Sequence, residues 1–291
     1  MEIERLDEAD ALVVGHEQAD DQGVVDSGDQ PAMPETRDQQ AYRAEYRATV
    51  EAVYTWDAAA LELRQVWEAH ETKWPSPEDA HGDGDRHLNP EANAEVESRC
   101  GQIREIAENI ITPAMRALES EDPDRHLIGL EHRLKGTERL KEKVAAELEA
   151  RPGLSAAQAL ASVPDAIRFT LCYSEERYVV GVAGALERLT ACGFELAKRP
   201  RNSWDSDQYK GINTQWREPE TGQRFEVQFH TWASFEAKQL SHEAYERIRN
   251  SGTPAAELDE LEDFQRQVCV KVPIPPGSTE ITYAPRREHD A

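Results

Sequence analysis

The stretch Phe225-Glu226-Val227-Gln228-Phe229-His230 alternates strictly between apolar and polar side chains. Because successive side chains of a β-strand point to opposite faces, this pattern predicts a strand with one wholly apolar face. The other face then carries Glu226, Gln228 and His230 together. These three polar residues are interpreted either as a solvated face of a sheet or as part of a site that does chemistry.

Strands and helices alternate around this stretch. Residues 166–173 and 212–217 show the same period of two, and the turn residues 219–222 join the second of these strands to Phe225 in a hairpin. A further strand is predicted over 193–198, followed by a loop over 199–208. Apolar residues at helical spacing predict helices over 137–150, 177–192 and 234–249.

The chain divides into four parts along its length. Residues 1–38 are acidic and lack periodicity, so we expect a disordered arm. Residues 39–125 carry apolar residues at helical spacing and predict a helical region. The alternating strands and helices fall within residues 126–250, and residues 251–291 predict an acidic helix followed by an irregular, Pro-rich tail.

The net charge is distributed unevenly. The chain has 291 residues, with 33 Lys and Arg against 57 Asp and Glu, and a formal net charge of −24. Residues 131–250 hold 18 basic and 18 acidic residues, so the whole imbalance lies outside this block. Residues 1–38 alone hold 12 acidic residues and 2 basic ones. The acidity argues against a protein that grips nucleic acid through overall positive charge, but leaves room for a local cationic site.

Targeting and redox signals are few. The four cysteines are widely spaced and form no CxxC pair, which argues against a zinc site or a disulfide framework. No run approaches the ~18 apolar residues that span a bilayer. Residues 11–14 are too short an apolar run for a signal-peptide core. We expect a cytoplasmic location and no membrane partner, while delivery by a specialised secretion system stays open.

Charged residues gather at two further places in the balanced block. Asp165 stands at the start of the strand over 166–173, with Arg168 a few residues along. Five bases lie at the entry and first turns of the helix over 137–150: Arg133, Lys135, Arg139, Lys141 and Lys143. Bases at a helix N-terminus oppose the helix dipole, but together they suit a polyphosphate.

Two carboxylates on neighbouring strands, Asp165 and Glu226, could hold Mg²⁺ beside such a phosphate. This is the minimal equipment for phosphoryl or nucleotidyl transfer, in which positioning and charge neutralisation supply most of the catalysis. A salt-bridged surface helix and a turn aspartate are the plain alternatives, since Glu131, Glu138 and Glu142 alternate with the bases.

Four motifs of the block resemble the RelA/SpoT-type synthetase domain. They are His132-Arg133-Leu134-Lys135-Gly136-Thr137-Glu138-Arg139-Leu140-Lys141-Glu142-Lys143, Val163-Pro164-Asp165-Ala166-Ile167-Arg168, Gln208-Tyr209-Lys210-Gly211-Ile212-Asn213-Thr214 and Phe225-Glu226-Val227-Gln228-Phe229-His230-Thr231. Enzymes of this family move pyrophosphate from ATP to the 3′-hydroxyl of a purine nucleotide and make (p)ppGpp or (p)ppApp. The resemblance covers about residues 128–250, and the arrangement is similar to nucleotide 3′-pyrophosphokinases and toxin-like small alarmone synthetases from high-GC bacteria.

The resemblance implies an α+β fold, with a mixed, mostly antiparallel five-stranded sheet flanked by helices and an N-terminal helical region before it. It implies Mg²⁺ as the cofactor and ATP as the co-substrate, with a purine nucleotide as the acceptor. A toxin-like member would also have an antitoxin or immunity protein as a partner.

The resemblance also assigns the residues that would bind ATP. Arg133 would contact the adenine, and Arg168 would flank it from the other side. Lys135 and Lys143 would bind the phosphates. The chemistry implied is in-line attack on the β-phosphorus of ATP, with AMP leaving.

The resemblance gives catalytic roles to three further residues. Asp165 would be the principal Mg²⁺ ligand, and Glu226 would hold Mg²⁺ or take the proton from the attacking 3′-hydroxyl. Gln228 would support the same strand face. The acceptor would be bound by four residues, with the first stacking on its base: Tyr209, Lys210, Asn213 and His230.

This sequence departs from the family pattern at several of these positions. The segment from Asp165 to Arg168 is shorter than usual and lacks a glycine before the arginine. Asn213 replaces the usual histidine and His230 replaces the usual arginine, so guanine is not assumed to be the acceptor base. The hydrolase half of long family members carries a His-Asp metal motif, whereas His289-Asp290 lies in the terminal tail. We therefore predict synthesis without hydrolysis.

Two other functions stay open. The first changes the acceptor to the 3′ end of tRNA, which the basic residues over 198–201 could touch, although the net charge disfavours RNA. The second is a catalytically silent interaction protein that docks a partner through Leu61, Val66, Trp67 and the apolar face over 103–111. The acidic arm could in addition compete with ATP for a cationic site.

Overall fold

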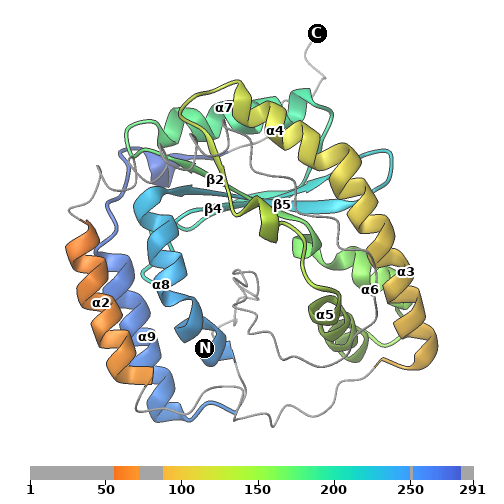
Figure 1. Ribbon diagram of the computed structural model, residues 1–291, viewed down its shortest axis with the longest axis horizontal. Coiled ribbons are helices and arrows are strands. Elements are labelled where there is room, and N and C mark those ends of the chain that lie inside the picture. Colours follow the sequence, from red (N-terminus) through yellow and green to blue (C-terminus); the bar gives the residue numbers. More distant parts are fainter. Residues whose placement is uncertain (1–55, 72–87, 250–251, 283–291) are drawn as a thin grey trace, which may run out of the picture.

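The computed structural model describes residues 56–71, 88–249 and 252–282 (Figure 1). The arm predicted to be disordered, residues 1–38, lies outside the described residues, as do the first part of the helical region and the end of the tail. The described chain forms a central sheet with helices on both of its faces.

One five-stranded sheet forms the centre of the described chain. Its strands are β1 (His126–Ile128), β2 (Arg168–Tyr173), β3 (Glu195–Asn202), β4 (Ile212–Arg217) and β5 (Arg224–Thr231). They lie in the order β1-β2-β5-β4-β3; β2 and β5 are parallel, and the other three neighbouring pairs are antiparallel. The predicted α+β class with a mixed, mostly antiparallel five-stranded sheet is confirmed.

Helices build the other layers. They are α2 (Trp56–Glu71), α3 (Pro90–Ile106), a π-helical turn (Ala107–Ile111), α4 (Thr112–Ser120), α5 (Thr137–Ala150), α6 (Ala156–Ser162), α7 (Tyr178–Ala191), α8 (Trp232–Arg249) and α9 (Ala255–Val270), with short 3₁₀ turns at Leu130–His132, Pro164–Ala166 and Ser278–Glu280. Helix α7 lies on one face of the sheet and α8 on the other (Figure 1).

The apolar face of β5 packs against α7 and the residues that follow it. Phe225, Val227 and Phe229 are fully buried, as the alternation predicts. The ring of Phe225 meets the ring of Phe194 edge-on, with their centroids 4.9 Å apart. The Tyr178 hydroxyl donates to the Phe229 carbonyl at 2.9 Å, which ties α7 to the middle of the sheet.

The polar face of β5 is covered by α8, which begins directly after the strand. The Thr231 hydroxyl oxygen accepts from the Ser234 N–H at 3.2 Å, so the first turn of the helix is capped where the chain reverses. Glu226, Gln228 and His230 are only 2%, 0% and 0% exposed. Their interpretation as a solvated sheet face is therefore wrong, because a helix covers them.

The edge strand β3 is longer than the sequence pattern predicts. A strand was expected over 193–198 with a loop after it, but β3 continues to Asn202. Pro200 is tolerated there because β3 pairs with β4 alone, so a missing N–H on the open side breaks no ladder. The basic residues over 198–201 consequently lie in a strand and not in a loop.

Segments far apart in the sequence hold α8 from outside. Helix α2 lies beside α9 and also contacts α8 (Figure 1). The Trp67 ring lies 5.2 Å from the Phe264 ring, and the Arg247 guanidinium lies 5.7 Å from the Trp67 centroid. Helix α8, which covers the polar face of β5, is thus held in place from outside by contacts of the Trp67 ring.

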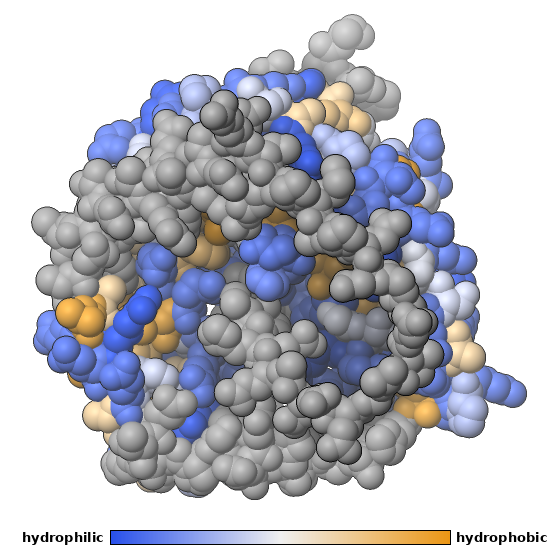
Figure 2. Space-filling model, in the orientation of Figure 1, coloured by the Kyte–Doolittle hydropathy of each residue, from blue (hydrophilic) through white to orange (hydrophobic). Residues whose placement is uncertain are grey.

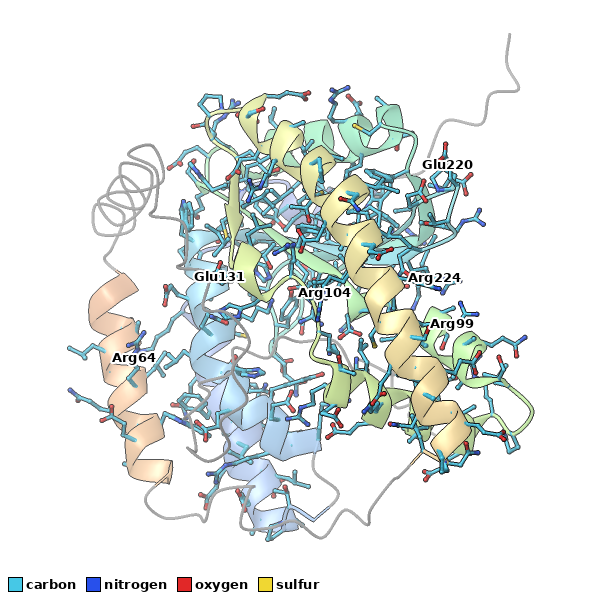
Figure 3. All side chains as sticks on the ribbon, turned by 45° about the vertical axis from the view of Figure 1, so that its right-hand side comes forward. Arg64, Arg99, Arg104, Glu131, Glu220 and Arg224 are labelled. Atoms are coloured by element: carbon cyan, nitrogen blue, oxygen red, sulfur yellow. The ribbon has the colours of Figure 1, made fainter. Side chains whose placement is uncertain are left out.

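The surface considered for partner docking is only partly exposed. Trp67, Ile103 and Ile111 are buried, whereas Leu61, Val66 and Ile110 are exposed. The described surface in Figure 2 is mainly hydrophilic. The side chains of Arg64 on α2 and Arg99 on α3 are exposed (Figure 3); Arg64 pairs with Glu236 on α8 and Arg99 with Glu95 one turn away. None of the described helices is long and apolar enough to cross a membrane.

Candidate active site

Asp165 is held where the chain passes from α6 into β2. Helix α6 opens with a capping box, in which the Ser155 hydroxyl accepts from the Gln158 N–H and the Gln158 side chain accepts from the Ser155 N–H. The turn Pro164–Ala166 follows the helix, and Asp165 within it is 1% exposed. A carboxylate buried this deeply needs charged or hydrogen-bonding partners.

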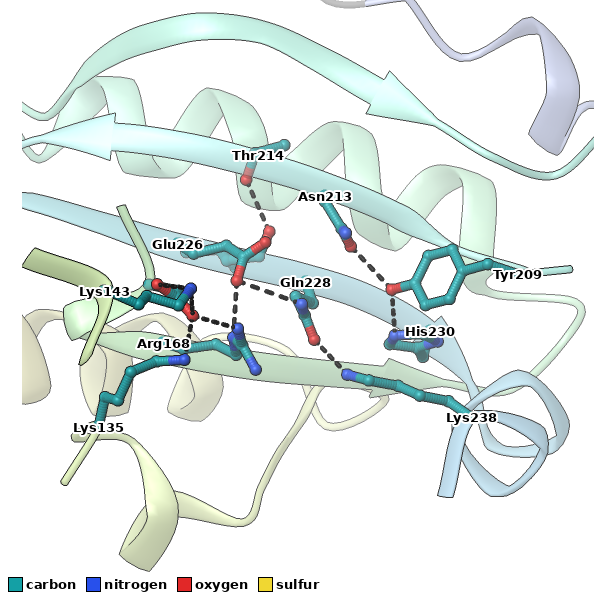
Figure 4. Close-up of polar contacts among 12 residues, drawn as sticks. Lys135, Lys143, Arg168, Tyr209, Asn213, Thr214, Glu226, Gln228, His230 and Lys238 are labelled. Carbon is teal, nitrogen blue, oxygen red and sulfur yellow. Dashed lines mark hydrogen bonds and ion pairs between the residues drawn. The ribbon is translucent and has the colours of Figure 1, made fainter. Parts of the chain in front are cut away.

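Three cations supply those partners (Figure 4). Lys135 Nζ lies 2.5 Å from Asp165 Oδ2, and Lys143 Nζ lies 2.9 Å from both carboxylate oxygens. Arg168 Nη2 lies 2.9 Å from Oδ2. The structure therefore brings together two residues predicted to bind ATP phosphates and the residue predicted to bind Mg²⁺.

Backbone pairing explains why Lys135 reaches Asp165. Leu134 forms an isolated antiparallel bridge with Ile167, and the Lys135 N–H donates to the Ala166 carbonyl at 3.1 Å. This pairing sets the residues just before α5 beside the residues just before β2. Lys143 reaches the same carboxylate from within α5.

The charged groups around Asp165 shift one another's pKa values. Burial alone would raise the pKa of Asp165, but attraction by Lys135, Lys143 and Arg168 outweighs it and holds that pKa well below its usual range. Burial lowers the pKa of Lys135 to about 8; attraction by Asp165 opposes this, while repulsion from Lys143 and Arg168 adds to it. Asp165 is therefore ionised at neutral pH among an excess of positive charge, which a polyphosphate would relieve.

Arg168 joins Asp165 to the second carboxylate. In the parallel pair of β2 and β5 it lies opposite Glu226, and its Nε donates to Glu226 Oε2 at 2.7 Å. Arg168 is 7% exposed and Glu226 is 2% exposed, so the ion pair is shielded from water. Arg168, predicted to flank the adenine, here bridges the two carboxylates.

The polar row continues along β5 to α8 (Figure 4). Gln228 Nε2 donates to Glu226 Oε2 at 3.2 Å, and Lys238 Nζ donates to Gln228 Oε1. Lys238 comes from α8 and is 5% exposed. Burial lowers its pKa well below the usual range; repulsion by Arg168 adds to this shift, while attraction by Glu226 opposes it.

Three of the four predicted acceptor residues form one network farther along the sheet (Figure 4). The Tyr209 hydroxyl donates to Asn213 Oδ1 at 2.8 Å and lies 2.9 Å from His230 Nε2. His230 Nδ1 lies 2.9 Å from the Ser234 hydroxyl. Burial, reinforced by Lys238, keeps the pKa of His230 well below its usual range, so the ring is neutral. The network offers polar atoms and aromatic faces to a ligand.

The side chains of two predicted residues form their hydrogen bonds outside these clusters. Arg133 Nε donates to the Thr112 hydroxyl at 3.0 Å, and its Nη2 pairs with Glu108, so it is held against the helices that follow α3. Lys210 Nζ donates to the Trp204 carbonyl at 2.9 Å within its own loop. Neither side chain contacts Asp165, Glu226 or the Tyr209 network through these bonds.

Sequence reasoning missed Lys238, and it named Arg201 only as part of a basic run that could touch RNA. Lys238 could have been noticed, because at helical spacing it stands between Ser234 and Ser241 on a buried face of α8. Arg201 lies opposite Asn213 in the β3–β4 pair. Burial lowers its pKa, and attraction by Tyr209 and by Glu226 partly offsets this effect.

The donor set fits a magnesium ion bound together with a nucleotide. Among the described residues no group of three or more His, Cys, Asp or Glu side chains could hold a metal ion. Mg²⁺ commonly takes only one or two carboxylates from the protein and completes its octahedron with phosphate oxygens and water. Asp165 and Glu226, joined through one guanidinium, provide that minimal set.

Comparison with known proteins returns no matching family model and no matching curated protein. Among solved structures, the chain is similar to small alarmone synthetase 1 from Bacillus subtilis, with 15% identity over 59% of this chain and 89% of that one and a TM-score of 0.43. The same protein bound to its product pppGpp gives 16% identity, 60% and 91% coverage and a TM-score of 0.41.

A GTP pyrophosphokinase family protein from Streptococcus pneumoniae is similar at 15% identity, over 62% of this chain and 89% of that one, with a TM-score of 0.41. All three TM-scores are below 0.5, so the function has to be argued from the site.

Proposed function

We propose that this chain is a Mg²⁺-dependent ATP:purine-nucleotide 3′-pyrophosphotransferase, a synthetase of (p)ppGpp- or (p)ppApp-type alarmones without hydrolase activity. One observation carries the proposal. Asp165 meets Lys135 and Lys143 in a buried cluster, and Arg168 links that cluster to Glu226. Carboxylates for a metal and ammonium groups for phosphates thus occur within hydrogen-bonding reach of one another.

The donor half of the reaction is assigned to Lys135 and Lys143. Their charges are directed at Asp165. A bound triphosphate would offer them oxygens with more negative charge and release the Asp165 carboxylate for a metal ion. When bound, Mg²⁺ would neutralise charge that develops on the phosphate oxygens.

Glu226 is assigned the role of general base for the 3′-hydroxyl of the acceptor nucleotide. Two donors, Arg168 and Gln228, both bind its Oε2, and Oε1 takes no part in either bond. We assign Glu226 to accept the proton of the 3′-hydroxyl as that oxygen attacks the β-phosphorus of ATP and AMP departs. Asp165 has a strongly depressed pKa and suits a ligand role better than a base role.

Binding of the acceptor's purine base is assigned to the network of Tyr209, Asn213 and His230. An aromatic face stacks on any purine, while the polar atoms beside it distinguish the base edges. The neutral His230 supplies no fixed positive charge at this end of the site. The choice between guanine and adenine nucleotides is therefore left to direct measurement.

Product chromatography tests the proposal. The chain is incubated with γ-labelled ATP, Mg²⁺ and, in turn, AMP, ADP, ATP, GDP, GTP or tRNA. Label on the 3′ position of a free purine nucleotide, with one AMP formed for each transfer, is the expected result. Label on tRNA alone would assign the chain to tRNA modification instead. The Asp165→Asn variant should abolish transfer, and Asp259→Asn, an exposed carboxylate on α9, should not.

A further inference from the structure

Lys238 is a buried lysine that the proposed transfer chemistry has not used. Its side chain is 5% exposed, and it enters the site from α8, on the opposite side of Gln228 from Glu226. An ammonium group removed from water destabilises a protein unless its partners recover the lost hydration, and an apolar residue of similar size is often more stable there. A lysine at this position therefore calls for a functional reason.

The hydrogen bonds of Gln228 suggest what that reason is. Its side-chain amide has one end that accepts and one end that donates. Lys238 Nζ donates to Oε1, and Nε2 then donates to Glu226 Oε2 at 3.2 Å. If the amide were turned over, its oxygen would meet the Glu226 carboxylate, which is repulsive, and Lys238 Nζ would lose the oxygen to which it donates. Lys238 therefore favours one of the two amide orientations.

This selected orientation bears directly on Glu226. The carboxylate receives Arg168 Nε from β2 and Gln228 Nε2 from its own strand, both on Oε2. Two donors on one oxygen fix the rotation of the carboxylate, and neither of them occupies Oε1, the oxygen assigned to the proton of the 3′-hydroxyl. Without Lys238 the Gln228 amide would lose the donor that favours this orientation, and one of the two constraints on Glu226 would be weakened.

We propose that Lys238 is a positioning residue for the transfer reaction, which acts through Gln228 to orient the carboxylate of Glu226. The inference rests on the proposed function and adds to it a residue on α8. Because α8 is held by the Trp67 contacts of α2 and α9, the same proposal makes the orientation of Glu226 depend on the packing of those outer helices.

Steady-state kinetics of Lys238→Met test this role. We expect kcat to fall about 10- to 100-fold, the usual effect of removing a residue that orients a catalytic ligand, while KM for ATP changes less than about twofold. The melting temperature should stay the same or rise, because a buried polar group is replaced by an apolar one. Lys271→Met, at a lysine that pairs with Glu62 away from the site, is the matched control and should leave kcat unchanged.

The paired variant Gln228→Leu separates a positioning role from direct contact with substrate. If Lys238 acts through Gln228, Gln228→Leu lowers kcat by a similar factor, and adding Lys238→Met to it lowers kcat no further. A Lys238→Met enzyme that keeps its kcat overturns the proposal, and so does an equal further loss in the Gln228→Leu background. Single-turnover measurements with excess enzyme keep the slow variants measurable.

Failure of the proposed function would look different. In that case the unmodified chain would form no 3′-pyrophosphorylated nucleotide from any acceptor, and all variants would also lack transferase activity. A normal wild-type turnover with an unaffected Lys238→Met variant would instead leave the proposed function standing and remove only the role of Lys238.

Discussion

Arg168 on β2 lies directly opposite Glu226 on β5, and its guanidinium binds Glu226 with Nε and Asp165 with Nη2. The two contacts run at 2.7 and 2.9 Å, and both carboxylates are almost wholly buried. A single side chain therefore connects the two acids that the proposed chemistry needs.

This bridge predicts a large stability loss when Arg168 is removed. In Arg168→Gln, Glu226 loses its cationic partner and Asp165 keeps two of three, so unfolding should require about 3 kcal/mol less free energy. Arg168→Lys keeps the charge but loses the two-pronged geometry and should lose less. Urea unfolding measures both. Equal stability of Arg168→Gln and the wild type would show that the bridge contributes nothing to the fold.

A second prediction concerns the metal dependence of ATP binding. In Asp165→Asn, Lys135 and Lys143 lose their carboxylate partner and are free to meet phosphate oxygens. Calorimetry without Mg²⁺ should find ATP bound at least as tightly as by the wild type, whereas kcat/KM with Mg²⁺ should fall by about 100-fold or more. Weaker metal-free binding by the variant would contradict the assignment of both lysines to the phosphates.

A third prediction follows from a buried histidine of α8. Burial lowers the pKa of His242 to about 4, and Lys238 and Arg168 reinforce the effect. Between pH about 4 and the ordinary histidine pKa near 6.5, the unfolded chain binds a proton there that the folded chain does not. Stability should consequently fall as the pH falls through this window, with a slope of up to about 1.4 kcal/mol per pH unit from this group.

Replacement of His242 tests that slope. His242→Gln should flatten the decline in urea-unfolding free energy between pH 6.5 and pH 4. Replacement of the exposed His132 by Gln is the control and should leave the slope as it is. The Asp165 cluster contributes little to the decline in this window, because a carboxylate with a depressed pKa loses its stabilising effect only at lower pH.

A fourth prediction concerns the close approach of Gly211 to His230. A Cβ on residue 211 would lie 2.9 Å from His230 Cε1 and 3.0 Å from the Phe229 carbonyl oxygen, and the backbone φ is +151°. Gly211→Ala should raise KM for the acceptor several-fold, leave KM for ATP near its wild-type value and destabilise the fold by about 1–3 kcal/mol.

Gly101→Ala is the matched control for the Gly211 variant. Nothing lies within 4 Å of a Cβ at residue 101, which stands inside α3. Alanine should stabilise this helix by about 0.5–1 kcal/mol and leave both Michaelis constants alone. If both substitutions changed KM for the acceptor by the same factor, the prediction would be wrong, and Gly211 would have no specific role at the acceptor site.

Much of the fold was predictable because it follows local rules. Alternation over 225–230 and 166–173 predicted strands, and helical spacing predicted α5, α7 and α8. Where local rules were weak, prediction failed. The edge strand β3 extends through Pro200 because a neighbouring strand holds it, which no pattern within residues 199–202 indicates.

The site was predictable in its residues more than in its contacts. The spacing of acids and bases named Asp165, Lys135 and Lys143, and these three meet in space. The same reasoning grouped Arg133 with them, yet Arg133 turns to Glu108 and Thr112, which lie more than twenty residues earlier in the chain. Which of several neighbouring bases faces a carboxylate depends on elements that a short motif does not contain.

Local sequence determined the alternating strands, the helices and the polar face that carries Glu226, because each depends on residues within a few positions of one another. Only the tertiary structure decided that this face is buried, that Arg168 bridges two carboxylates and that Lys238 reaches Gln228. The reason is physical. The parallel register of β2 with β5 and the return of α8 across the sheet bring together charges from distant segments, and their burial then sets their partners and protonation.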